Sequence, residues 1–159
     1  MEIVAALDTA QVELVRGLFQ EYWTSFGFTP CFQNFGQEAA ALPGEYAPPG
    51  EYAPPGGRLG LALIDCEPAG CAALRRFDGA RCEAKRLYVR PKFRGRGLGR
   101  ALLDWVIAEA RGAGYCELLG DTMPVMAEAL EMYRRMGFER TGPYAGNPTP
   151  GAIFLRLKL

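Results

Sequence analysis

The chain has no histidine among its 159 residues. Catalysis by Ser-His-Asp or Cys-His arrangements is therefore excluded, and so are metal sites that depend on histidine. Any acid–base chemistry must use carboxylates, tyrosine, cysteine, lysine or water. We accordingly expect no metal cofactor.

An excess of charge and long apolar runs are also missing. Eighteen basic and eighteen acidic residues give zero formal charge, whereas a nucleic-acid-binding domain is usually strongly basic. No apolar run reaches the ~18 residues of a membrane span. The first residues, MEIVAALDTAQVE, lack the basic segment and long apolar stretch of a signal peptide. We therefore expect a cytoplasmic protein with no nucleic-acid partner and no membrane partner.

The cysteines show no pairing pattern, because none belongs to a CxxC motif. They are Cys31, Cys66, Cys71, Cys82 and Cys116. An odd, scattered set indicates reduced thiols and neither a disulfide framework nor a zinc site. We expect each of them to behave as a small buried apolar side chain.

Length and patterning predict a single domain, residues 1–159. Apolar runs predict strands near residues 2–6, 59–67, 70–78, 81–89, 115–120, 138–142 and 152–159. We expect the first hairpin turn at Glu67–Gly70 and the second at Asp78–Ala80.

Helical spacing of apolar residues predicts three clear helices. The first follows a capping box at Asp8, and the second follows the glycine-rich loop near residue 97. The third is expected to start at Thr122 as its cap, with Pro124 in its first turn, and to run to Met136. Between Trp23 and Leu42 we expect a loop and a weaker helix.

The resulting order, β-α-α-β-β-β-α-β-α-β-β, predicts an α/β (α+β) fold. It implies a mixed, mostly antiparallel sheet of about six or seven strands with helices on both faces. Residues 44–57 form a Gly/Pro-rich surface loop in which GEYAPP occurs twice, because paired prolines block helix and central strand. This loop is either a tolerated duplication or a lid that uses Tyr46 or Tyr52.

The stretch FRGRGLGRALLDW, residues 93–105, predicts an anion site at the start of a helix. Unpaired N–H groups and the helix dipole attract negative charge there, and glycines let an oxyanion approach the backbone. Between Ala84 and Leu103 the chain has no acidic residue. It has seven basic ones: Lys85, Arg86, Arg90, Lys92, Arg94, Arg96 and Arg100.

The spacing of this loop narrows the choice of anion. No lysine followed by Ser or Thr occurs, which excludes a Walker loop. Gly95, Gly97 and Gly99 are spaced GxGxG after hairpins, which does not fit a dinucleotide-binding fingerprint. One compact pyrophosphate fits the loop best.

Residues 94–99, RGRGLG, match the [QR]xxGx[GA] signature of the GNAT (general-control-related) N-acetyltransferase superfamily. LYVRPKFRGRGLGRALL also resembles that family's central strand, loop and helix, and ALEMYRRMGF resembles its closing helix. The resemblance implies a GNAT-like fold and an acetyl-coenzyme A-dependent enzyme without a metal.

The same resemblance implies which residues bind the cofactor. The loop would hold the pyrophosphate, and the preceding strand would pair with the pantetheine arm through its backbone. The implied residues are Leu87, Tyr88, Val89, Arg94, Gly95, Arg96, Gly97, Leu98, Gly99 and Arg100. Many members carry an asparagine seven residues before the tyrosine of the closing helix, and this chain has Met126 there.

Two catalytic residues are implied. Tyr133 corresponds to the family tyrosine and would be the acid that protonates the departing thiolate; its alternative is a core residue. Glu83, eleven residues before Arg94, would be the base that neutralises the amine. Its alternatives are an ion pair with Lys85, Arg75 or Arg76, or a water chain as the base.

The reaction implied is acetyl transfer to a primary amine by direct attack in a ternary complex. We expect an amine of a small molecule or amino acid; a protein amine is the alternative. Candidate walls are residues 23–35, the doubled loop, and PYAGNPTPG with Tyr144 and Asn147. The acids Glu21, Glu38, Glu45 and Glu51 either attract a cationic amine or are solvated.

Two further expectations remain open at the level of sequence. A non-catalytic acyl-coenzyme A-binding or sensor domain of the same fold is the alternative function. The final strand, IFLRLKL, could pair across a homodimer if it lies at an edge of the sheet.

Overall fold

The structure is a computed structural model, and it describes residues 1–27, 34–42, 57–144 and 149–159. The doubled hexapeptide with Tyr46 and Tyr52, Cys31 and Asn147 lie outside the described residues.

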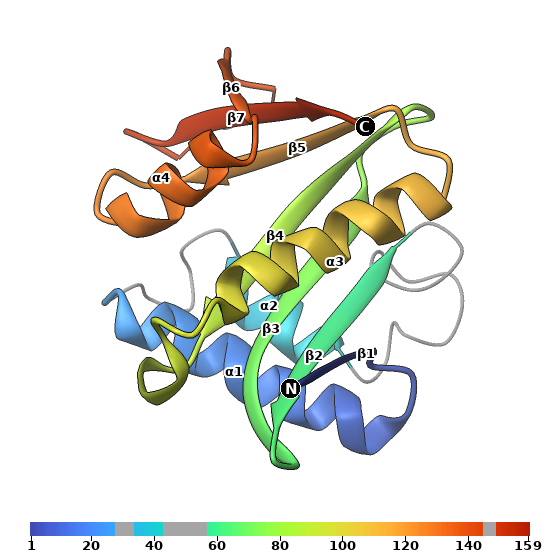
Figure 1. Ribbon diagram of the computed structural model, residues 1–159, viewed down its shortest axis with the longest axis vertical. Coiled ribbons are helices and arrows are strands. Elements are labelled where there is room, and N and C mark those ends of the chain that lie inside the picture. Colours follow the sequence, from blue (N-terminus) through green and yellow to red (C-terminus); the bar gives the residue numbers. More distant parts are fainter. Residues whose placement is uncertain (28–33, 43–56, 145–148) are drawn as a thin grey trace.

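One mixed sheet of seven strands, in the order β1-β2-β3-β4-β5-β7-β6, forms the centre of the molecule (Figure 1). All neighbouring strands are antiparallel except β4 and β5, which are parallel. The strands are β1 (Glu2–Ala5), β2 (Arg58–Ile64), β3 (Glu67–Arg76), β4 (Arg81–Val89), β5 (Glu117–Thr122), β6 (Glu139–Thr141) and β7 (Ile153–Lys158). The predicted order of strands and helices is therefore confirmed.

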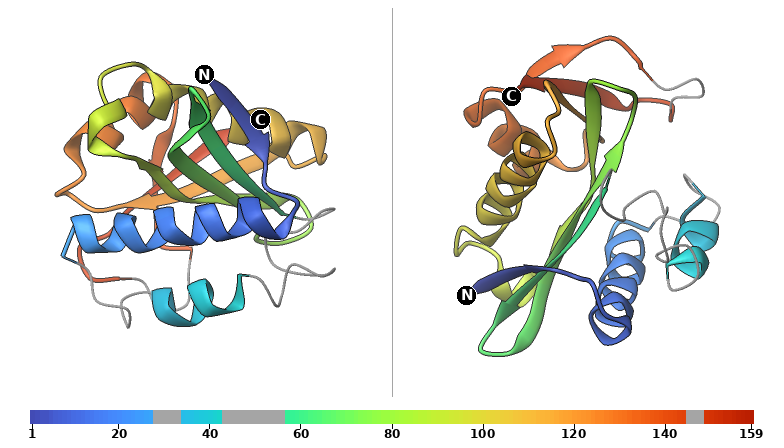
Figure 2. Two further views of the ribbon diagram at one scale, coloured as in Figure 1. Left: turned by 90° about the horizontal axis from the view of Figure 1, so that it is seen from below. Right: turned by 90° about the vertical axis from the view of Figure 1, so that its right-hand side faces the viewer.

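Helices cover both faces of the sheet, as expected. Figure 2 shows α1 (Thr9–Ser25) and α2 (Phe35–Ala41) on one face, and α3 (Leu98–Gly112) and α4 (Ala127–Arg135) on the other. Each helical layer covers its own apolar core, because alternate residues of a strand point to opposite faces. A short 3-10 helix, Pro91–Phe93, lies between β4 and α3.

The capping box predicted at Asp8 is present. The Asp8 side chain accepts a hydrogen bond from the Gln11 N–H at 2.8 Å, and the Gln11 side chain accepts one from the Asp8 N–H at 3.4 Å. Helix α1 runs further than the sequence suggested, since Trp23 lies within it and is buried.

The first hairpin turn was predicted at the wrong place. The turn is Asp65–Cys66, and Glu67–Gly70 belongs to β3. Both turn residues have positive φ, 50° and 63°, as a two-residue hairpin turn of type I′ requires. Pro68 marks a register shift near Leu63, where an irregular ladder tolerates a residue without an N–H.

The predicted cap of the third clear helix was also wrong. Thr122 is the last residue of β5 and pairs with Ile153 of β7, so it cannot begin a helix. The chain turns between Met123 and Met126, whose backbone groups hydrogen bond at 2.8 Å, and α4 begins at Ala127.

Two smaller expectations are corrected as well. Strand β7 is not an edge of the sheet, because β5 and β6 flank it. Cys71 and Cys82 are buried thiols, but Cys66, in the hairpin turn, and Cys116 are exposed.

Across the described chain, no helix combines the length and apolar character needed to cross a membrane.

Candidate active site

The parallel strands β4 and β5 separate to form a fork. Their pairing runs from Arg81 with Glu117 to Ala84 with Gly120, and the register ends there. Figure 1 shows the two strands diverging beyond this point. A cavity of about 30 Å³ lies in the fork, bordered by Ala84, Lys85, Arg86, Leu87, Asp121, Thr122, Met126, Ala129 and Tyr133.

A bulge in β4 adds to the separation. Cys71 of β3 pairs with Tyr88 but Ala73 pairs with Lys85, so two residues of β4 oppose one of β3. Arg86, within this bulge, has a φ of 55°, which is uncommon for a residue with a side chain. A bulge leaves backbone groups outside the ladder and redirects a side chain, so this stretch of β4 can offer N–H donors to a ligand.

The glycine-rich loop lies at the start of α3 and has the backbone that the sequence predicted. Gly95 and Gly97 have φ values of 74° and 78°, and Gly97 caps the helix without a side-chain hydrogen bond. A Cβ at Gly99 would lie 3.8 Å from the Met132 sulfur and from Val89, so a side chain there would fill part of the space beside the loop. The exposed N–H groups of this turn fit a pyrophosphate.

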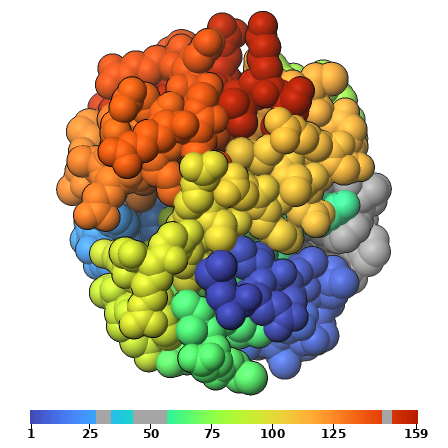
Figure 3. Space-filling view, viewed as in Figure 1, coloured from blue at the N-terminus to red at the C-terminus, as the bar shows by residue number. Residues whose placement is uncertain are grey.

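A groove of about 650 Å³ runs from this loop to the fork, a volume typical of small-molecule sites. In Figure 3 the groove is the notch between the yellow-green loop residues and the orange residues at the start of α4, with the blue end of α1 behind it. Nine of the ten predicted cofactor-binding residues border it. They are Leu87, Tyr88, Val89, Arg94, Gly95, Gly97, Leu98, Gly99 and Arg100.

Arg96 is the predicted cofactor-binding residue that does not border the groove. Its guanidinium lies 6.0 Å from the centre of the Phe93 ring. Most of the basic excess is matched by acids from elsewhere: Lys85, Arg86, Arg90, Lys92 and Arg100 each pair with a carboxylate. Among the described residues, only Arg94 and Arg96 of the seven lack such a partner.

Tyr133 lies on α4 with its side chain at the fork cavity. Its ring packs edge-on against Phe138, with 5.1 Å between centroids, and only 6% of the residue is exposed. Within the described chain, its hydroxyl has no hydrogen-bond partner. Burial raises the pKa of Tyr133 well above its usual range, so the hydroxyl keeps its proton at neutral pH.

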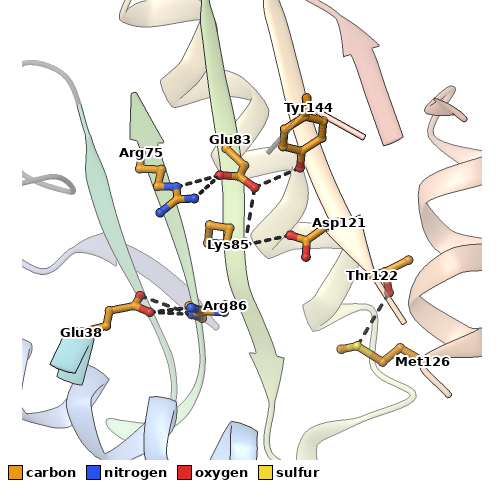
Figure 4. A network of polar contacts seen from close by, with 9 residues as sticks. All are labelled: Glu38, Arg75, Glu83, Lys85, Arg86, Asp121, Thr122, Met126 and Tyr144. Carbon is orange, nitrogen blue, oxygen red and sulfur yellow. Dashed lines mark hydrogen bonds and ion pairs between the residues drawn. The ribbon is translucent and has the colours of Figure 1, made fainter. Parts of the chain in front are cut away.

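Glu83 lies at the centre of a polar network (Figure 4). Its Oε2 accepts hydrogen bonds from the Arg75 guanidinium at 2.6 Å, and its Oε1 accepts one from the Tyr144 hydroxyl at 2.9 Å. The Lys85 ammonium is 3.4 Å from Oε1. These are the ion pairs that the sequence left open as the alternative role of Glu83, and its role as a base stays a prediction.

Three residues at the fork were missed by sequence reasoning. Asp121 pairs with Lys85 at 2.8 Å, and the Thr122 hydroxyl donates to the Met126 sulfur over 3.7 Å. Tyr144, which the sequence predicts only as a wall of the acceptor site, donates a hydrogen bond to Glu83. The available signal was position, because Asp121 and Thr122 end the strand that lies parallel to the glycine-loop strand.

The acids expected near the acceptor are already paired. Glu38 of α2 binds the Arg86 guanidinium at 2.5 Å, and the Phe35 ring lies 4.0 Å from that guanidinium. Glu21 of α1 binds Arg90 at 2.6 Å. Neither acid is simply solvated, while Glu45 and Glu51 lie outside the described residues.

Comparison with known proteins identifies the class of enzyme. Residues 55–140 match the family model of the acetyltransferase (GNAT) domain. An uncharacterised N-acetyltransferase of Schizosaccharomyces pombe is 38% identical over 147 residues, which cover 89% of this chain and 85% of the yeast protein. The chain therefore belongs to the GNAT acetyltransferases and is an acyl-CoA-dependent acetyltransferase.

Solved structures agree with this assignment. An acetyltransferase from Streptococcus agalactiae shares the fold over 99% of this chain and 98% of its own, with a TM-score of 0.79 and 18% identity. A GNAT family acetyltransferase from Elizabethkingia anophelis, solved with acetyl-CoA bound, is 29% identical. It covers 65% of this chain and 76% of its own, with a TM-score of 0.57.

Proposed function

We propose that this enzyme moves an acetyl group from acetyl-CoA to a primary amine of a small molecule or amino acid by direct attack in a ternary complex. One observation carries the proposal. The groove that begins at the glycine loop ends at a fork between two strands, where Tyr133 borders the cavity and its hydroxyl has no hydrogen-bond partner among the described residues. A tyrosine hydroxyl can both donate and accept a hydrogen bond, so this one is available to a ligand in the cavity.

Binding of acetyl-CoA uses backbone groups in this proposal. The N–H groups at Gly95–Gly99 take the pyrophosphate, assisted by Arg94, whose Nε also donates to the Val89 carbonyl at 3.0 Å. The β4 edge from Leu87 to Val89 pairs with the pantetheine arm, which brings the thioester to the fork. N–H donors of the bulge stabilise the oxyanion that forms there.

The chemistry then needs an acid and a base. The protonated amine loses one proton to the base, and its neutral nitrogen bonds to the thioester carbon. The nitrogen then loses a second proton to solvent, and the carbon–sulfur bond breaks with its electron pair going to sulfur. Tyr133 donates its proton to the thiolate and regains one from solvent. Glu83 remains the predicted base, and a water chain is the alternative.

Direct attack is supported by the composition of the site. Among the described residues that border the groove and the fork cavity, there is no cysteine and no serine, so no thiol or serine hydroxyl is placed to take the acetyl group first. The surroundings of the fork support a small acceptor. Tyr144 hydrogen bonds to Glu83, and Glu38 of α2 pairs with Arg86, so both segments lie close to the fork and leave limited room beside it.

The test is a screen of amines with acetyl-CoA, in which release of the free thiol is recorded. We expect thiol release with small primary amines and intersecting double-reciprocal plots, as a ternary complex requires. Parallel plots would indicate an acetylated enzyme instead. Cofactor binding by calorimetry without thiol release from any amine would indicate the non-catalytic alternative.

A further inference from the structure

Met126 lies where the cofactor groove meets the fork cavity. Among the described residues that border the groove, three also border the cavity: Leu87 of β4, Met126, and Ala129 of α4. Of these, Met126 has the longest and most flexible side chain, and it extends from the turn between β5 and α4. Any part of a cofactor that enters the cavity from the groove must therefore pass Met126.

The Met126 side chain reaches into the fork between the strands. It packs against the apolar core under α1 and α2, whereas Ala129 and Met132 of α4 pack against the core under α3. Figure 4 shows the side chain directed from the start of α4 toward β4. Met126 comes from one helical layer and contacts the core of the other, so it lies within the fork and not on one of its faces.

A hydrogen bond holds the Met126 side chain in this position. The Thr122 hydroxyl, on a residue that is only 4% exposed, donates to the Met126 sulfur over 3.7 Å. A thioether sulfur is a weak acceptor, so the bond directs the side chain while its apolar contacts remain. Three rotatable bonds would otherwise leave a methionine free to adapt to its surroundings.

Met126 is a poor residue for its position in the helix. It is the N-cap of α4 and, within the described residues, makes no side-chain hydrogen bond to the helix backbone. Ser, Thr, Asp and Asn are preferred there because their side chains accept a hydrogen bond from a backbone N–H. Residues that break such a local rule are expected at functional sites. The contacts in the fork, and not the helix, account for a methionine at this position.

The fork cavity has room for a very small group. Its volume of about 30 Å³ is only about twice the ~10–15 Å³ that one water molecule needs. An acetyl group carries a single methyl beside its carbonyl, whereas a butyryl group carries two further methylenes. A longer acyl chain that enters the cavity would therefore meet the side chains that border it, and Met126 is the one at the entrance.

We propose that Met126 restricts the acyl group of the cofactor to acetyl. This rests on the cofactor placement in the proposed function, which puts the pantetheine arm in the groove and the thioester at the fork. The Met126 side chain fills the space into which a longer acyl chain would extend. Extra methylenes would have to displace it from Thr122 and from the core under α1, and overpacking of this kind is unfavourable.

Replacement of Met126 by Ala tests this role with the cofactor alone. Calorimetry compares the binding of coenzyme A, acetyl-CoA and butyryl-CoA, so no acceptor is needed. For the wild-type enzyme we expect butyryl-CoA to bind at least about 10-fold more weakly than acetyl-CoA, the lower end for one methylene in an apolar pocket. In Met126→Ala the two acyl-CoAs should bind equally, because the space at the entrance is open.

Met132→Ala is the matched control, since Met132 also borders the groove but does not border the fork cavity. We expect it to change the affinity of both acyl-CoAs by the same factor. Met126→Ser serves as a second variant should Met126→Ala fail to fold, because it also removes the thioether and serine is preferred at an N-cap.

The inference is overturned if the wild-type enzyme binds both acyl-CoAs equally, if the Met126 variants keep the discrimination, or if Met132→Ala also abolishes it. Discrimination that depends on Met126, without thiol release from any amine, would support the inference and contradict the proposed acetyl transfer. Absence of binding by coenzyme A itself would overturn both.

Discussion

Two tyrosines near the fork differ in what their hydroxyls contact. Tyr144 donates to Glu83 and lies edge-on against Phe77 and Phe154. Tyr133 is more buried and, within the described residues, its hydroxyl has no partner. Burial raises the pKa of both, so both hydroxyls are protonated at neutral pH. Of the two, only Tyr133 borders the fork cavity, and for this reason Tyr133 is the one we propose as the proton donor.

Replacement of Tyr133 by Phe tests that distinction. We expect the turnover number to fall at least about 100-fold because the thiolate loses its acid, while calorimetry shows unchanged affinity for coenzyme A. Tyr115→Phe is the control, since Tyr115 is also partly buried against the core but precedes the other end of β5. Equal effects of the two substitutions would remove Tyr133 from the mechanism.

At the scale of an element, two glycines at the start of α3, Gly97 and Gly99, have different roles. Gly97 has a φ of 78°, which residues with a Cβ adopt at a cost. Gly99 lies within the helix, and a Cβ there would meet the Met132 sulfur and Val89 at 3.8 Å. The first glycine is needed for the turn, and the second keeps the groove open.

A series of alanine substitutions should separate these uses. Gly97→Ala should lower the free energy of unfolding by about 1 kcal/mol and weaken coenzyme A binding. Gly99→Ala should weaken binding without loss of stability, because alanine favours helix. Gly112→Ala, at the far end of α3 with open space around its Cβ, is the control and should leave binding unchanged. Urea unfolding and calorimetry provide both readouts.

The cap of α1 gives a second prediction at this scale. Asp8→Ala removes the hydrogen bond to the Gln11 N–H, which should lower the free energy of unfolding by about 1 kcal/mol. Asp104→Ala is the control, because Asp104 makes only an exposed ion pair with Arg100, worth about 0.3–0.5 kcal/mol. Equal losses in urea unfolding would contradict the assigned cap.

The sequence predicted what depends on local pattern. Within the described residues, apolar spacing located the seven strands and the helices α1, α3 and α4, although it misplaced the first hairpin turn and the start of α4. The glycine loop was found from its own residues. The amino-acid sequence did not predict which side chains from different elements would be in contact. The pair Lys85–Asp121 joins residues 36 positions apart, and Tyr144 reaches Glu83 across 61. The strand role of Thr122 also depends on β7, so threonine's preference for helix caps was misleading.

At the scale of the whole molecule, the sheet consists of two antiparallel parts. Strands β1 to β4 form one part, and β5, β7 and β6 form the other. The two parts pair with each other only over Arg81–Ala84 and Glu117–Gly120. The groove draws its borders from both parts, with the glycine loop following β4 and α4 following β5.

Binding of coenzyme A should therefore stabilise the whole fold. At a ligand concentration 100 times the dissociation constant, the gain is about 2.7 kcal/mol. For a chain of this length, that corresponds to a rise in melting temperature of roughly 5–10 °C. Tyr133→Phe should show the same rise, and Gly99→Ala a smaller one. A melting temperature that does not respond to coenzyme A would contradict the site.

The short parallel pairing of β4 and β5 is the place where the two antiparallel parts of the sheet meet. A pantetheine arm lying along the open edge of β4 would hydrogen bond to that strand beyond Ala84, where the pairing with β5 ends. It would therefore extend the sheet across the junction of the two parts. The bound cofactor would then link the two parts of the sheet while it holds its acetyl group at the fork.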